Sequence, residues 1–326
     1  MEMNLTLPSV ADVEDARRII AGSAIRTPLV RLNVAGVPEI YLKLENLQPI
    51  GSFKIRGASN AMGHLPLETL QRGVLTASAG NMAQGVAWRA RELGVACTVI
   101  APETAPETKI AAIQRLGGRV LKVPFEEWWR TIERRSYPGV DGTFIHAFDD
   151  LHVMAGNGTI ALEVLEDLPD VNAIVIPWGG GGLTCGIAAV MRVLRPDCRI
   201  YAAEVSTAAP LAPSLAAGSP QTIPYQPSFV DGIGGKSVFP QMFEWFPGGG
   251  AGRGRGGPPP AGGTQSHHRG RRGRLPGSLC AHRPGRRWQN RLCGFGGKHR
   301  SGQTMCLVRR PGSCCLIPFP TPPHCV

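Results

Sequence analysis

Acidic residues are absent from the last quarter of this chain. Residues 246–326 contain no Asp or Glu, yet they hold 14 of the 35 Lys and Arg residues and six of the nine cysteines. The other 21 basic side chains share residues 1–245 with all 24 acidic ones, so the net charge of +11 comes from the end of the chain alone. We therefore expect residues 1–245 to be an ordinary, mildly acidic globular protein.

Long apolar runs and closely spaced cysteines are also missing. No apolar run approaches the roughly 20 residues that cross a bilayer, and the N-terminus lacks the charged and apolar regions of a signal peptide. Cys97, Cys185 and Cys198 are odd in number and widely spaced, a pattern typical of buried free thiols in a reducing compartment. We expect a cytoplasmic protein with no membrane partner.

A regular alternation of apolar runs and helix-compatible runs predicts an α/β fold. A helix at 9–20, a strand at 40–44 and a short helix at 54–62 come first. Strands are then expected at 74–77, 96–100, 119–123, 144–146, 173–176 and 199–204, with helices at 82–93, 107–116, 125–135, 160–165 and 184–194. Continuous apolar strands that alternate with helices indicate parallel sheets covered by helices.

A lysine stands in the first turn of the short helix expected at 54–62. It belongs to the run Ser52-Phe53-Lys54-Ile55-Arg56-Gly57, which follows a Gly-Ser turn. An ammonium group there faces the positive end of the helix macrodipole. This position favours the neutral amine, the form that a Schiff-base lysine requires. The alternative interpretation is a solvated surface lysine, which is the commoner situation.

Two further motifs lie where an expected strand ends and a helix begins. Ser78-Ala79-Gly80-Asn81 follows the strand at 74–77, and Trp178-Gly179-Gly180-Gly181-Gly182-Leu183 follows the strand at 173–176. Backbone N–H groups at a helix N-terminus bind anions, and consecutive glycines let the backbone wrap closely around one. The glycine run is followed by neither a G-K-S/T sequence nor a dinucleotide fingerprint. The structural alternative for the first motif is an N-cap serine with a turn glycine, and that for the second is a glycine-rich linker.

The three motifs together resemble the fold-type II pyridoxal-phosphate enzymes, in particular the threonine/serine dehydratases (ammonia-lyases) and the related serine racemase. Ala155-Gly156-Asn157-Gly158-Thr159 and Asp231-Gly232-Ile233 also resemble family segments, so that the resemblance spans about residues 8–245. It implies a tryptophan synthase β-like fold. In this fold residues 1–72 and 147–245 form a large cofactor-binding domain, and residues 73–146 form a small βα domain.

The resemblance also implies roles for individual residues. Lys54 is expected to hold pyridoxal 5′-phosphate covalently and to remove the substrate α-proton. Ser78, Gly80 and Asn81 are expected to bind the substrate carboxylate, and Asn81 also to bind the 3-oxygen of the cofactor. The remaining cofactor contacts are expected from Phe53, Gly179, Gly180, Gly181, Gly182, Leu183 and Gly232.

Two positions bear on the reaction type and on metals. Serine racemase has a second serine where this chain has Ala79, and racemisation needs an acid/base on each face of the substrate. The resemblance therefore favours dehydration of threonine or serine to a 2-oxo acid and ammonia. Glu204 matches a position that helps to bind a cation in some members, but few oxygen ligands follow it, and we expect no metal.

Residues 246–326 match no part of this family. They are rich in Gly, Pro and Arg, and we expect them to be disordered or loosely packed. A nucleic-acid-binding arm, a metal-binding tract and a frameshift product are the three alternatives, and we favour the frameshift. Read one base later, permitted codons for 293–299 can spell V-V-S-G-G-N-I, and those for 269–274 can spell V-V-A-E-G-A. Both resemble family segments.

The functional hypothesis is thus a lyase that acts on a small amino acid. The alternative is an inactive remnant whose basic tail binds nucleic acid, although nucleic acid is the less favoured partner. Oligomeric state is left open by the sequence, with a homodimer among the options. So is the preference for threonine or serine.

Overall fold

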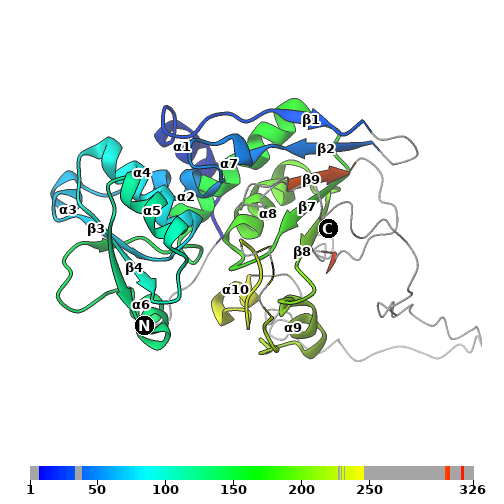
Figure 1. The fold of residues 1–326 in the computed structure, drawn as a ribbon. Coiled ribbons are helices and arrows are strands. Elements are labelled where there is room, and N and C mark those ends of the chain that lie inside the picture. The colour runs from blue at the N-terminus through cyan, green and yellow to red at the C-terminus, as the bar shows by residue number, and fades with distance from the viewer. Residues whose placement is uncertain are drawn as a thin grey trace, which may run out of the picture.

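The computed structural model describes residues 7–33, 39–226, 228, 230 and 232–245, together with two short strands at 305–308 and 317–318. Figure 1 shows two groups of elements, each built around its own sheet. Helices α2 (Lys54–Gly63) and α7 (Leu151–Asp167) lie between them. Helix α2 packs against α4 (Asn81–Leu93) on one side and against α7 on the other.

The smaller sheet is parallel throughout, as the alternating pattern predicts. Its strands are β3 (Val74–Ala77), β4 (Cys97–Pro102), β5 (Arg119–Val123) and β6 (Thr143–Phe144), in the order β5-β4-β3-β6. The connections contain α4, α5 (Glu107–Arg115) and α6 (Phe125–Arg134), and α3 (Leu67–Gln71) precedes β3. Parallel strands need such crossover helices. The extent of a smaller domain at 73–146 stays a proposal.

The larger sheet is mixed, which differs from the expectation of parallel sheets. Its order is β1-β2-β9-β7-β8-β10, and within it only β7 (Ala173–Pro177) and β8 (Arg199–Ala203) pair in parallel. They are joined by α8 (Gly182–Leu194). Strands β1 (Leu29–Arg31) and β2 (Ile40–Lys43) are antiparallel, because the short connection between them leaves no room for a crossover helix.

Two strands of this sheet come from residues 246–326. Strand β9 (Met305–Val308) lies between β2 and β7 and is antiparallel to both, and β10 (Ile317–Pro318) pairs with β8. For these six residues the expectation of a tail without regular structure is corrected. Both segments are short apolar runs within a Gly- and Arg-rich sequence, and such runs can pair with an available strand edge. The rest of 246–326 lies outside the described residues.

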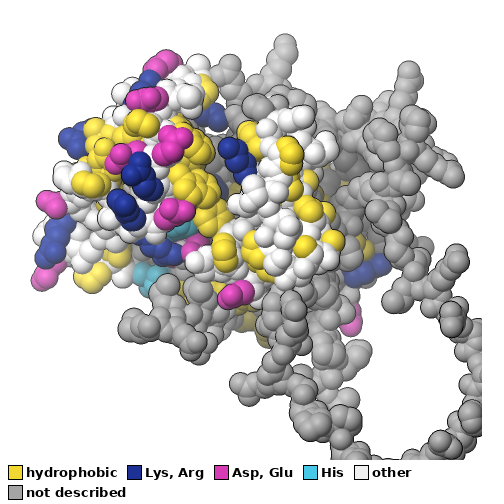
Figure 2. Space-filling model, turned by 90° about the horizontal axis from the view of Figure 1, so that it is seen from below, with side chains coloured by type: hydrophobic (Ala, Val, Ile, Leu, Met, Phe, Trp, Pro, Cys, Tyr) yellow, Lys and Arg dark blue, Asp and Glu magenta, His cyan; other side chains and the backbone are white. Residues whose placement is uncertain are grey.

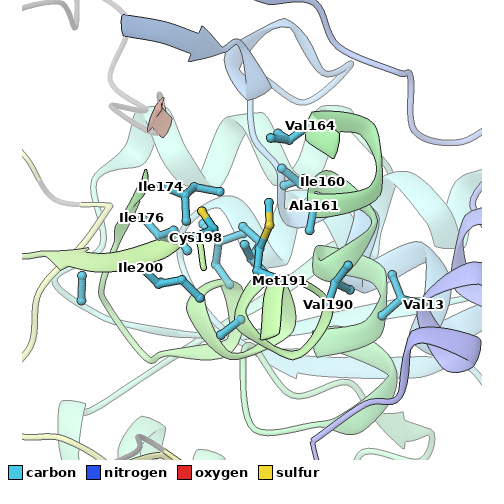
Figure 3. Packing of buried hydrophobic residues seen from close by; sticks show 14 of the residues in the cluster. Val13, Ile160, Ala161, Val164, Ile174, Ile176, Val190, Met191, Cys198 and Ile200 are labelled. Atoms are coloured by element: carbon cyan, nitrogen blue, oxygen red, sulfur yellow. The ribbon is translucent and has the colours of Figure 1, made fainter. Parts of the chain in front are cut away.

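The core of the larger group lies between its sheet and helices α1 (Val10–Ile19), α7 and α8. Figure 3 shows ten labelled residues of this core: Val13, Ile160, Ala161, Val164, Ile174, Ile176, Val190, Met191, Cys198 and Ile200. The expected strand at 173–176 and helix at 184–194 supply several of them. Helix α1 begins after the N-cap Ser9, which forms a reciprocal capping box with Asp12.

The remaining helices are short, and one expected helix is longer than its apolar run suggested. The 3₁₀-helix η1 spans Glu45–Leu47, α9 spans Leu211–Ala217 and α10 spans Pro240–Glu244. The run at 160–165 is the second half of α7, which starts after the N-cap Asp150. Within the described part of the chain, no helix has the length and apolar character that a membrane span requires. On the face drawn in Figure 2, Lys and Arg side chains are interspersed with Asp and Glu.

Candidate active site

Lys54 is the first residue of α2, and its amine is held inside the protein. The backbone N–H of Lys54 donates to Ser52 Oγ at 3.3 Å, and Nζ donates to the carbonyl of Ala147 at 2.6 Å. Burial lowers the pKa of Lys54 from 10.5 to about 8. At pH 7 about one molecule in ten then carries the neutral amine, against fewer than about one in a thousand for a solvated lysine.

The lowered pKa was expected, but its cause differs from the one inferred from the sequence. The macrodipole argument rested on the helix N-terminus, whereas removal of the amine from water is the cause that accounts for this shift. The ring of Phe53, with its centroid 5.3 Å from Nζ, contributes to that enclosure. The interpretation of Lys54 as a freely solvated lysine is therefore wrong.

Arg56, two residues further on, anchors the beginning of α2 in a buried ion cluster. Its guanidinium donates two hydrogen bonds to Glu45 at 2.8 Å, and two to Glu163 at 2.6 and 2.9 Å. Lys43 Nζ lies 2.5 Å from Glu163 and completes two cations and two carboxylates. All four side chains are buried. Sequence reasoning quoted Arg56 without giving it a role, although an arginine inside an otherwise buried helical run could have signalled one.

The loop Ser78–Asn81 joins β3 to α4, at the carboxyl edge of the smaller sheet. Ser78 is tied to β4 through its N–H, which donates to Ile100 O at 3.1 Å, and its Oγ accepts from Gly80 N at 3.1 Å. Gly80 is the N-cap of α4, and no atom lies within 4 Å of where its Cβ would be. One turn later, a Cβ on Gly85 would lie 3.2 Å from the Lys54 carbonyl oxygen. The loop thus begins a helix that packs directly on the start of α2.

The glycine run joins β7 to α8, also at a strand-to-helix junction. A Cβ on Gly180 would lie 2.3 Å from the ring of Phe148, and one on Gly182 would lie 2.6 Å from the Phe148 carbonyl oxygen. Gly181 is the N-cap and has a φ of 91°, and no side chain caps α8. The first N–H groups of a helix have no partner within it, so this end of α8 is suited to an anion. Leu183 is buried in the core.

The turn at Gly232 lies beside the first glycine of this run. A Cβ on Gly179 would be 3.6 Å from Ile233 Cα and 4.0 Å from the Gly232 carbonyl, and Gly234 N donates to Trp178 O at 3.3 Å. Asp231, the first residue of that motif, lies outside the described residues. The start of the glycine run and the turn at Gly232–Gly234, about fifty residues apart in the chain, therefore lie side by side.

Residues 146–149, which sequence reasoning did not single out, connect the lysine to the glycine run. The Ala147 carbonyl accepts from Lys54, and the neighbouring Phe148 packs on Gly180 and Gly182. His146 Nδ1 accepts from the N–H groups of Phe148 at 3.3 Å and Asp149 at 2.8 Å. The sequence signal that could have found this segment is the set of polar residues His146, Asp149 and Asp150. They stand between an expected strand and the helix that carries the Ala155-Gly156-Asn157 run.

Glu204 directly follows β8, and its side chain caps the N-terminus of α9. Its carboxylate accepts from Leu211 N at 3.0 and 3.2 Å and from Ala212 N at 3.4 Å. Burial raises the pKa of Glu204 to about 7. Over the described ranges, no three His, Cys, Asp or Glu side chains converge on a common point. The expectation of no metal stays a prediction.

The family model described as "Pyridoxal-phosphate dependent enzyme" matches residues 20–253. The L-threonine ammonia-lyase of Thermotoga maritima is 39% identical over 241 residues, which is 72% of this chain and 60% of that protein. The L-threonine ammonia-lyase of Geobacter sulfurreducens is 45% identical over 212 residues, 63% of this chain and 52% of that one. This chain thus spans less than two thirds of each.

A solved structure agrees with the sequence matches. Maize serine racemase is 30% identical, covers 74% of this chain and 74% of its own, and superposes with a TM-score of 0.68. This likeness supports the fold-type II architecture described above, with its two sheets and intervening helices.

Proposed function

The chain belongs to the pyridoxal-phosphate dependent enzymes, and on that premise we propose that it is a threonine/serine ammonia-lyase, which converts L-threonine or L-serine to a 2-oxo acid and ammonia. The observation that carries the proposal is the partly buried Lys54 amine, which donates to the Ala147 carbonyl at 2.6 Å and has a lowered pKa. Helix α4, which the Ser78–Asn81 loop begins, packs on the start of the lysine helix at Gly85, and Phe148, next to the residue that Lys54 bonds, packs on the glycine run. The two ammonia-lyase relatives support this choice of reaction.

The residues present fit pyridoxal 5′-phosphate. Lys54 offers an amine that is neutral in a useful fraction of molecules, as covalent attachment requires. The glycine run offers the N-terminus of the 13-residue helix α8, where phosphate groups bind. When bound, the cofactor supplies an electron sink for the charge left on the substrate α-carbon. Gly179–Leu183 would hold its phosphate, and Phe53, Asn81 and Gly232 would flank its ring.

The chain's own side chains then perform the proton transfers and the binding. We assign the substrate carboxylate to Ser78, Gly80 and Asn81, because their loop begins α4 and leaves the space beside Gly80 open. Lys54, once displaced from the cofactor, would remove the α-proton. A base of pKa about 8 can accept this proton and is regenerated easily near neutral pH.

The replacement of Lys54 tests this proposal directly. Lys54→Ala and Lys54→Arg should both lose covalent cofactor attachment, measured as cofactor fixed to the peptide by borohydride, and should lose 2-oxo acid production from L-threonine. Lys122→Ala, which removes a lysine from a partly exposed ion pair with Glu107, is the control and should retain both. Wild-type turnover by either Lys54 variant would overturn the assignment.

The remnant alternative makes a different prediction. A non-catalytic chain with a nucleic-acid-binding tail would show no borohydride-fixed cofactor on Lys54, and it would bind DNA with an affinity that falls steeply as salt rises. The proposed enzyme shows the fixed cofactor whether or not its tail binds DNA. We also propose a cytoplasmic location, which the buried, unpaired Cys97, Cys185 and Cys198 support, and a homodimer, which light scattering can test.

A further inference from the structure

We propose that His146 is a positioning residue of this site: its neutral imidazole, accepting through Nδ1, holds the turn that sets the Ala147 carbonyl on the Lys54 amine and Phe148 on the glycine run. The inference rests on the proposed function only in taking Lys54 as the reactive amine. His146 acts on the Lys54 amine and on the glycine run through the two residues next to it in the chain, Ala147 and Phe148.

The hydrogen bonds define the state of the ring. Nδ1 accepts from Asp149 N at 2.8 Å and from Phe148 N at 3.3 Å, so it carries a lone pair and the ring proton is on Nε2. A doubly protonated imidazolium would turn Nδ1 into a donor and lose both bonds. The ring is only 3% exposed and meets the Phe148 ring edge-on at 4.6 Å.

The surroundings keep the ring neutral. Burial, with the cations Arg135 at the end of α6 and Lys54 in α2, lowers the pKa of His146 to about 3. The charged groups of its own segment, Asp149 and Asp150, do not offset this: Asp149 pairs with Arg135 at 2.7 Å and Asp150 caps α7 through Val153 N. The lowered pKa and the two hydrogen bonds to Nδ1 both favour a neutral ring near neutral pH, where His146 acts as a fixed acceptor and not as a proton-transfer group.

Each residue of the turn faces a different part of the site. The Ala147 carbonyl is 2.6 Å from Lys54 Nζ. Phe148 fills the space beside Gly180 and Gly182. Asp149 accepts from Arg135 through its carboxylate and its carbonyl, at 2.7 and 3.0 Å. The two N–H groups that donate to His146 belong to Phe148 and Asp149. Phe148 contacts the glycine run and Asp149 pairs with Arg135 at the end of α6. Loss of the acceptor therefore removes the hydrogen bonds that hold both residues next to Ala147.

Three substitutions distinguish the effect of the hydrogen-bond acceptor at Nδ1 from the effect of the ring's volume. His146→Asn places a carbonyl oxygen near the position of Nδ1, and His146→Gln places one near Nε2, where it cannot reach either N–H group. His146→Leu fills the volume with no acceptor. His64→Asn is the matched control, because its ring stacks on His152 at 3.9 Å, in contact with Asp15 and not with Lys54.

Two readouts are independent of turnover. The first is the pH midpoint at which acetic anhydride labels the Lys54 peptide in the cofactor-free protein. The second is the rate at which pyridoxal phosphate becomes fixable to Lys54 by borohydride. We expect His146→Asn and His64→Asn to keep the wild-type midpoint and rate. His146→Gln and His146→Leu should move the midpoint and slow attachment about ten- to a hundredfold, because small displacements of reacting groups have effects of that order.

The outcomes are distinct. A folded Leu or Gln variant with the wild-type midpoint and rate overturns the proposal, and so does an Asn variant that is as slow as the Gln variant. If Leu does not fold, the comparison of Asn with Gln decides. A wild-type protein that attaches cofactor but releases no 2-oxo acid from threonine or serine contradicts the proposed function and leaves the His146 test intact. If no cofactor attaches at all, the labelling midpoints still decide.

Discussion

At the scale of single residues, burial has opposite effects on the pKa values of Lys54, whose amine we propose to be reactive, and of its neighbour Arg56. Lys54 is isolated from carboxylates, and burial therefore lowers its pKa. Arg56 is more completely buried, but two carboxylates keep it charged, and its pKa is raised. The same helix turn thus holds one cation that can become neutral and one that cannot. The second fixes the helix so that the first stays in place.

Removal of Arg56 should destabilise the protein strongly. Arg56→Met leaves Glu45 and Glu163 buried with only Lys43 as a counter-charge, and uncompensated buried charges typically cost about 3–5 kcal/mol. Urea denaturation should show this loss of unfolding free energy. Arg17→Met, which breaks an exposed pair with Glu166, is the control and should cost about 0–1 kcal/mol. Equal losses in the two variants would contradict the role given to the cluster.

Ala79 governs the reaction type in our proposal. We expect dehydration to dominate and D-serine to be negligible when L-serine is the substrate, because Ala79 supplies no acid/base where serine racemase has a second serine. Ala79→Ser should increase the share of D-serine relative to pyruvate, measured by chiral chromatography. The Ala79 methyl packs against the cluster of Ala101, Ala105 and Ile110, so the variant's melting temperature should be recorded alongside. Comparable yields of D-serine and pyruvate from the wild type would overturn the argument.

At the scale of elements, the helices that carry the site approach one another at glycines. A Cβ on Gly156 in α7 would lie 2.4 Å from the Arg56 carbonyl oxygen in α2, and one on Gly186 in α8 would lie 2.1 Å from the Met154 carbonyl in α7. The Ala155-Gly156-Asn157-Gly158-Thr159 segment therefore has a packing explanation. Its glycines, with Gly186 of α8, let the backbone of α7 approach the backbones of α2 and α8 closely. This close packing fixes the helix that carries Lys54 relative to the helix that follows the glycine run.

Glu204, which caps α9, should give the stability a specific pH dependence. Its pKa is about 7, against an ordinary value of 4.5. Between these values the folded protein binds more protons than the unfolded chain, so its contribution to the free energy of unfolding falls as the pH rises through that window. Glu204→Gln should remove the fall and be more stable than wild type above pH 7, by roughly 1–3 kcal/mol.

Denaturation curves at several pH values would check this. Below pH 4.5, where the carboxyl is protonated in both folded and unfolded states, the Gln variant and the wild type should converge. A constant difference between them at every pH would show that the glutamine changes the cap and not the titration.

At the scale of the whole molecule, the larger sheet depends on a strand from the C-terminal segment. Strand β9 occupies an interior position between β2 and β7. Without it, both neighbours would present unpaired edges. We still expect most of residues 246–326 to be a frameshifted sequence. In that interpretation β9 is an apolar segment of the altered frame that pairs with β2 and β7.

Restoration of the reading frame near codon 246 should raise the melting temperature and the activity together. A chain that ends at residue 245 should be the least stable of the three, because it lacks β9. Thermal denaturation and 2-oxo acid production from L-threonine, measured on the full, shortened and frame-restored chains, test this order. A full chain that resists proteolysis throughout 246–326 and is as active as the restored chain would show that the segment is an evolved extension.

Short-range periodicity and runs of neighbouring residues were enough to predict most of the strands and helices next to the motifs, the motifs at their junctions and the family. Only the tertiary structure decided which distant residues meet. The partners of Arg56 at positions 45 and 163, the acceptor of Lys54 at position 147 and the strand at 305–308 are set by packing between elements far apart in the chain. No local sequence pattern predicts these pairings, because the partner of a buried charge or of an unpaired strand edge is whichever group the fold brings next to it.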